Sequence, residues 1–127
     1  MLKVILLAIT GVLANNITGY YENGLGSSMQ LTCTGTAAAA ELSGFFFSSD
    51  RAAKGGYAIS GKATTCDARA QLAFSVAWSN TLSGNELSAT SWVAQALDTS
   101  PLSLSAMWIN VGVLRESMAI GSDLFTQ

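Results

Sequence analysis

Hydroxyl, amide and indole side chains recur in this sequence at spacings that favour holding a ligand over converting it. In residues 86–97, Ser88, Thr90 and Trp92 alternate with Leu87, Ala89, Ser91 and Val93. Because successive side chains of a β-strand point to opposite faces, these two hydroxyls and one indole would lie on the same face. An unpaired buried hydroxyl costs about 1–3 kcal/mol, so we expect something polar to pair with these groups.

Three tryptophans extend this pattern. Trp78 shares one face of residues 71–80 with Phe74 and Val76, and each of Trp78, Trp92 and Trp108 falls late in an expected strand. Indoles in such positions can wall the mouth of a pocket and hold the apolar body of a ligand. The alternative is that they are ordinary core tryptophans.

A polar pair flanks the short segment Gly24-Leu25-Gly26. Asn23 ends one expected strand and Ser27 precedes the next, so the Asn23 amide and the Ser27 hydroxyl could converge on one acceptor atom. Asn and Ser at a turn usually bond to the turn itself, which is the competing interpretation.

The residue inventory excludes several kinds of chemistry. The chain has no histidine and two cysteines, which excludes a His-assisted nucleophile, a His-based metal site and a Cys-rich zinc site. Six basic and eight acidic residues give a net charge of -2, which predicts no nucleic-acid partner. An enzyme could still pair the carboxyl of Asp123 with that of Glu22 or Glu116, although no spacing brings them together. We expect no catalytic residue, metal or cofactor.

The sequence pattern predicts that the segments carrying these residues are β-strands. Alternating, β-branched and aromatic runs are separated by Gly, Asn, Ser and Asp clusters, and proline occurs once. The expected strands are Ile17–Asn23, Ser28–Cys33, Glu41–Ser48, Tyr57–Ala63, Gln71–Asn80, Glu86–Leu97, Leu102–Val111 and Glu116–Thr126. They predict an all-β fold, an eight-stranded antiparallel up-and-down barrel with room inside for one small ligand. Helices over 37–42 or 89–96 are the competitor, which the Thr90, Trp92 and Val93 side chains disfavour.

The N-terminus is typical of an exported protein. Lys3 precedes an apolar stretch from Val4 to Ala14 that is too short to span a bilayer, so we expect a signal peptide over 1–14 and one barrel domain over 15–127. A buried first strand is the alternative interpretation. Export to a secreted or periplasmic location would let Cys33 and Cys66 form one disulfide; otherwise they are two buried thiols.

Six stretches resemble the avidin and streptavidin family of biotin-binding proteins, and the resemblance covers nearly all of residues 16–127. They are Thr18–Ser27, Leu42–Phe46, Phe74–Trp78, Ser88–Trp92, Met107–Trp108 and Gly121–Thr126. The resemblance implies non-enzymatic, high-affinity binding of biotin inside the barrel. Another carrier barrel, for a different small hydrophobic ligand, remains the alternative function.

The resemblance also implies a role for each site residue. Asn23 and Ser27 would donate to the ureido oxygen of biotin, and Ser48 and Asp123 would accept from its two N–H groups. Thr90 would face the ring sulfur and Ser88 the carboxylate of the side chain. The tryptophan cage would consist of Trp78, Trp92 and Trp108.

Two features depart from the family pattern. A tyrosine usually supplies a third donor to the ureido oxygen, and Phe46 stands at that position, so we expect weaker binding than in the tightest members. The segment 110–117 is short and offers Leu114 and Arg115 in place of a tryptophan that would reach a neighbouring subunit. This pattern is similar to that of short, dimeric avidin-like proteins, so a homodimer is favoured over a tetramer. No membrane partner is expected.

Overall fold

The computed structural model describes residues 16–35, 40–49, 55–80, 86–112 and 118–127. The expected signal peptide over 1–14 lies outside these residues, as do Leu114, Arg115 and Glu116. Among the described residues, no helix is long and apolar enough to cross a membrane.

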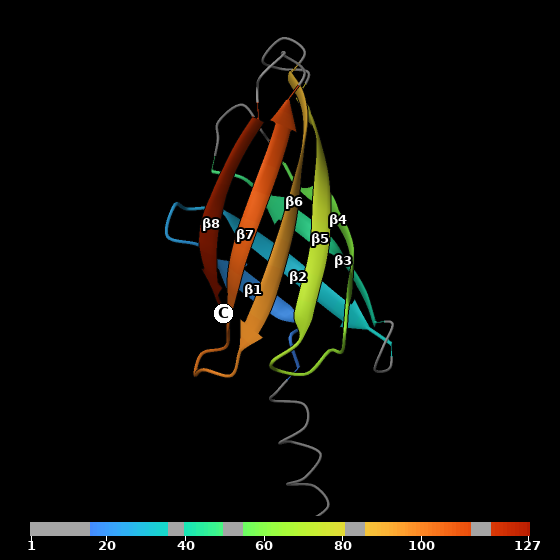
Figure 1. Ribbon diagram of the computed structural model, residues 1–127, viewed down its shortest axis with the longest axis vertical. Coiled ribbons are helices and arrows are strands. Elements are labelled where there is room, and N and C mark those ends of the chain that lie inside the picture. The colour runs from blue at the N-terminus through green and yellow to red at the C-terminus, as the bar shows by residue number, and fades with distance from the viewer. Residues whose placement is uncertain (1–15, 36–39, 50–54, 81–85, 113–117) are drawn as a thin grey trace, which may run out of the picture.

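Eight antiparallel strands form a closed barrel in the order of the chain, β1 to β8 (Figure 1). Their bounds are β1 Gly19–Glu22, β2 Ser28–Thr34, β3 Ala40–Phe47, β4 Tyr57–Ala63, β5 Gln71–Asn80, β6 Glu86–Leu97, β7 Ser103–Gly112 and β8 Met118–Thr126. The barrel predicted from the sequence is confirmed, and residues 89–96 lie in a strand, not a helix. The expected bounds of β4, β5 and β6 agree with the structure.

Burial alternates along the strands, which defines an inside and an outside. In β2 the buried residues are Met29, Leu31 and Cys33, with less buried or exposed neighbours between them. In β6, Thr90, Trp92 and Ala94 are buried, whereas Ser91 and Val93 are exposed. The faces expected from the period of two are therefore confirmed for both β5 and β6.

The seam between β1 and β8 is the least extensively paired contact between neighbouring strands of the barrel. Among the described residues, β1 and β8 are matched at one pair, Glu22 with Thr126, whereas β7 and β8 are matched from Val111 with Met118 to Ser103 with Thr126. At this seam, side chains must supply the cross-links that the backbone does not.

A disulfide joins Cys33, in β2, to Cys66, which follows β4. The expected pairing is thus confirmed, and the free-thiol alternative is wrong. Nearby, the backbone N–H of Ile17 donates to the carbonyl of Cys66 at 2.8 Å. These contacts lie at the end of the barrel where β2, β4 and β6 finish, and the turn between β1 and β2 lies at the other end (Figure 1).

Candidate functional site

Asn23 anchors the turn between β1 and β2. Its side-chain carbonyl Oδ1 accepts the backbone N–H groups of Leu25 and Ser27 at 3.0 and 2.9 Å. Gly26 supplies the positive φ of 89° that this turn needs. The expected role of Asn23 in the turn is therefore confirmed. Because the turn hydrogen bonds occupy Oδ1, the Nδ2 group points away from the turn.

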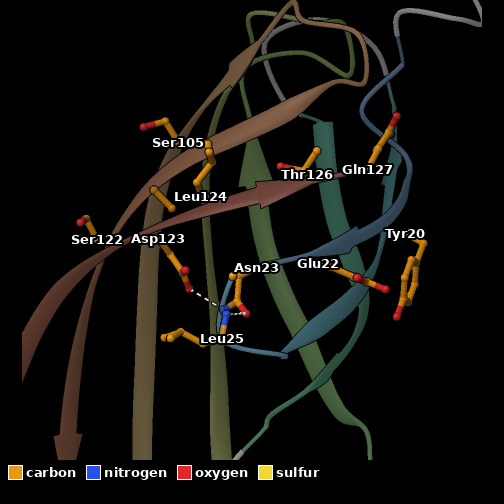
Figure 2. A pocket seen from close by; sticks show the side chains of 12 residues that line it. Tyr20, Glu22, Asn23, Leu25, Ser105, Ser122, Asp123, Leu124, Thr126 and Gln127 are labelled. Atoms are coloured by element: carbon orange, nitrogen blue, oxygen red, sulfur yellow. Dashed lines mark hydrogen bonds between the residues drawn. The ribbon is translucent and has the colours of Figure 1, made fainter.

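The Nδ2 group of Asn23 crosses the β1–β8 seam to Asp123. It donates to Oδ2 of Asp123 at 3.0 Å, and Figure 2 shows the two side chains pointing toward each other. An amide nitrogen carries two hydrogens, so one remains for another acceptor. The carboxylate likewise keeps capacity to accept. A donor and an acceptor, 100 residues apart in sequence, thus stand side by side.

Ser27, at the other end of the turn from Asn23, forms hydrogen bonds with Ser49, which lies just after β3. Its Oγ accepts the backbone N–H of Ser49 at 2.9 Å and donates to Ser49 Oγ at 3.3 Å. Ser48, between Phe46 and Ser49 in sequence order, is half-buried. Ser48 is the first residue after β3, two positions beyond the buried Phe46.

Phe46 occupies the centre of an aromatic cluster inside the barrel. Its ring stacks on Trp92 at 5.0 Å between centroids and meets Trp78 edge-on at 5.6 Å and Phe125 at 6.0 Å. Trp92 also stacks on Phe74 at 5.2 Å. Phe46 and Trp92 are each 4% exposed. Trp92 therefore lies deeper than the strand end where the sequence pattern placed it.

Trp78 and Trp108 are only partly buried and pack against the hydrophobic core. Trp108 is paired with Trp92 on the neighbouring strand, and Trp78 with Ser88. The indole of Trp108 lies over Gly121 of β8, where a Cβ atom would collide with the ring. Glycine at this position makes space for one wall of the site.

The Thr90 hydroxyl is bonded within the protein. It accepts from the indole Nε1 of Trp78 at 2.8 Å and from the amide Nδ2 of Asn110 at 2.7 Å. Its 6% exposure confirms that it is buried. The expectation that a polar group must pair with it is correct, but side chains of β5 and β7 supply those partners.

One buried donor has no partner. The indole Nε1 of Trp92 is the buried side-chain nitrogen or oxygen that remains unbonded among the described residues. Leaving such a group unpaired costs about 1–3 kcal/mol. The interior therefore contains a donor whose hydrogen-bonding capacity would be met by a polar guest or a water molecule.

The ten residues singled out from the sequence lie on inner faces at one end of the barrel, or in the turn and strand end that border it. They are Asn23, Ser27, Phe46, Ser48, Trp78, Ser88, Thr90, Trp92, Trp108 and Asp123. Phe46, Thr90 and Trp92 are buried, whereas Asn23, Ser88 and Asp123 are half-buried. Such an arrangement can surround a small molecule that combines an apolar body with a polar head.

A groove of about 1160 Å³ follows the β1–β8 seam (Figure 2). Asn23 and Asp123 line it, together with Glu22, Ser105, Ser122 and others. Glu22 is exposed on β1 and points away from Asp123 in Figure 2. The pair of carboxyl groups considered for acid–base chemistry is therefore not brought together at this seam.

Sequence reasoning missed Asn110 and Gly121. Asn110 is an inward-facing amide on β7 paired with Thr90, and its partner is 20 residues away in sequence. The period of two along residues 102–111 would have placed Asn110 on the Trp108 face, which was an unused signal.

The comparison with known protein families agrees with this geometry. The family model of the avidin family matches residues 12–127 of the chain. A search of curated proteins finds none that matches this chain.

Proposed function

This chain belongs to the avidin family, and from that premise we propose that it binds biotin non-covalently in the barrel interior, at high affinity and without chemical change. The observation that carries the proposal is the hydrogen bond between Asn23 and Asp123. A cyclic urea presents a carbonyl acceptor beside two N–H donors. The free hydrogen of the Asn23 amide and the Asp123 carboxylate offer the complementary pair.

The remaining polar residues extend the same recognition. The Ser27 hydroxyl, which donates to Ser49 in the unliganded protein, would donate to the ureido oxygen instead. Ser48 would accept a hydrogen bond from the second ureido N–H. Ser88, half-buried near the start of β6, would meet the carboxylate of the ligand's side chain. Thr90 would face the ring sulfur.

The aromatic residues would enclose the bicyclic body. Trp78 and Trp108, which are partly buried, would flank it, and Trp92 would lie beneath it. The unpaired Nε1 of Trp92 supports an interior that is completed by a guest. Burial of apolar surface in such a cage contributes roughly 25 cal/mol per Å².

The proposal is tested by isothermal titration calorimetry with biotin. Asp123→Asn replaces an acceptor oxygen with a donor, so we expect affinity to fall by at least 2 kcal/mol, roughly thirtyfold. Asp98→Asn is the matched control, because Asp98 is exposed and follows β6 at the opposite end of the barrel. Absence of heat with biotin, together with retained binding of an apolar dye, would favour the alternative of a carrier for another hydrophobic ligand.

We also propose that a second copy of this chain covers the outer face of β6, β7 and β8. The register matches Val93 with Met107, Ile109 with Ile120 and Val111 with Met118. The large apolar side chains exposed on this face are Leu87, Val93, Met107, Ile109, Val111, Met118, Ile120 and Leu124. The described outward positions of these three strands include no charged residue. We call these eight side chains the β6–β8 face.

The size of the β6–β8 face suits a dimer contact. Three strands about ten residues long span roughly 14 by 33 Å, the order of area that each partner contributes to a specific interface. Exposed apolar patches of this extent on soluble proteins mark interaction sites. A homodimer is the simplest closed assembly that buries the face.

Light scattering tests the assembly. Ile109→Lys places a charge at the middle of the β6–β8 face and should convert a dimer into monomers, whereas Ser60→Lys on exposed β4 should not. A wild-type monomer, or an Ile109→Lys dimer, would contradict this assignment of the face.

We propose a secreted or periplasmic location for the mature chain. The Cys33–Cys66 disulfide supports it, since disulfides persist in oxidising compartments.

A further inference from the structure

Asn110 lies in the wall of the proposed site, yet no biotin contact has been assigned to it. It is half-buried on the inner face of β7, directly opposite Thr90 of β6. Its Nδ2 group donates to Thr90 Oγ1 at 2.7 Å, and Trp78 Nε1 donates to the same oxygen at 2.8 Å. Side chains from three neighbouring strands therefore meet at one hydroxyl.

The chemistry of a hydroxyl makes this arrangement directional. A threonine hydroxyl has one hydrogen and two acceptor lone pairs. Donation by Trp78 and by Asn110 occupies both lone pairs of the Thr90 oxygen, so the Thr90 O–H bond must point in the one remaining direction. No described group accepts that hydrogen. Two donors acting on one oxygen also polarise its O–H bond, which strengthens it as a donor.

We infer that Asn110 is a positioning residue that makes Thr90 a dedicated hydrogen-bond donor to the ligand. This inference rests on the proposed function and deepens it. The site then selects ligands that present an acceptor, such as a ring thioether or ether, opposite Thr90. A ligand with only a methyl or methylene group there leaves a buried O–H unpaired, which is penalised.

A purely structural role for Asn110 predicts a different result. An amide that only fills space would change the melting temperature and affect all ligands alike. A positioning role changes the ratio of affinities between ligands that differ at the ring heteroatom. That ratio is the readout that separates the two roles.

The test measures biotin and desthiobiotin, which lacks the ring sulfur, by calorimetry on the wild type and on Asn110→Leu and Thr90→Val. The wild type should prefer biotin, and each variant should reduce that preference roughly threefold to tenfold. The double variant should show no larger loss of the preference for biotin than either single variant, because both changes remove the same hydrogen bond from Thr90 to the ligand.

Asn110→Asp provides a second variant of nearly the same shape if the leucine variant fails to fold. Its carboxylate would accept the Thr90 hydrogen, turn it away from the ligand and reduce the preference as well. Ser91→Ala, on the outer face of β6, should leave the preference unchanged. Full preference in Asn110→Leu or Asn110→Asp, with biotin still bound by the wild type, would overturn this inference alone. A wild type that binds neither ligand would instead refute the proposed function.

Discussion

At the scale of single residues, the two indoles that meet Phe46 differ in one hydrogen bond. Trp78 Nε1 donates to Thr90, whereas Trp92 Nε1 has no partner among the described residues. We therefore expect Trp78→Phe to lower the free energy of unfolding by about 1 kcal/mol more than Trp92→Phe. Chemical denaturation of the unliganded proteins measures this difference. An equal loss in both variants would contradict the assigned hydrogen bonds.

Substitution of Phe46 tests where the ureido oxygen binds, because Phe46 stands where the family usually has a donor tyrosine. We expect Phe46→Tyr to raise biotin affinity by about 0.5–1.5 kcal/mol, because a hydroxyl would join Asn23 and Ser27 around the ureido oxygen. Phe47→Tyr is the control, since Phe47 is the exposed neighbour. Calorimetry that shows no gain for Phe46→Tyr would count against placing the ureido oxygen near Phe46.

Tyr21 predicts how stability falls at high pH. Burial raises the pKa of its hydroxyl from 10.0 to about 12, against a smaller lowering by the hydrogen bond from Gln127. The hydroxyl also donates to the carbonyl of Ile17 at 2.6 Å. Because the folded pKa is the higher one, this contribution to stability is complete below pH 10 and is lost as pH rises from 10 to 12.

The loss over this window should approach about 1.4 kcal/mol per pH unit. Urea denaturation from pH 9 to pH 12 checks it, with Tyr21→Phe as the control that lacks the ionisable group. An identical pH slope in the variant would show that other groups control the alkaline transition.

At the scale of the elements, the disulfide and the proposed site lie at opposite ends of the barrel. Cys33 and Cys66 are separated by 33 residues, and closing a loop of this length stabilises a fold by roughly 3–4 kcal/mol. The Cys33→Ala, Cys66→Ala double variant should therefore melt on the order of 10 °C lower. Its biotin affinity should stay close to that of the wild type. A large loss of affinity without a loss of stability would contradict the separation of the two ends.

The strand pattern explains how much of this fold was accessible from sequence. Alternation along residues 71–80 and 86–97 placed Trp78, Thr90 and Trp92 inside, and the structure agrees because one face of each strand is buried. Strand register was not accessible, since it depends on pairing between distant residues. The contacts of Asn23 with Asp123 and of Asn110 with Thr90 both depend on it.

At the scale of the whole molecule, closure of the barrel makes the site possible. The wall of the proposed site draws on the turn after β1 and on β3, β5, β6, β7 and β8, so no local segment could assemble it. Closure also leaves the β6–β8 face exposed on a strand surface with no free edge, where it can meet a second copy. One architecture therefore separates the proposed ligand site, on the inside, from the proposed dimer contact, on the outside.

A thermal melt with and without biotin tests the central claim most directly, because a ligand that binds only the folded barrel raises its stability by mass action. At a free biotin concentration of about 1000 times Kd, the expected gain is about 4 kcal/mol, a rise in Tm on the order of 10 °C. The account predicts this rise for the wild type and about half of it or less for Asp123→Asn at the same biotin concentration. An unchanged Tm for the wild type in excess biotin would contradict it.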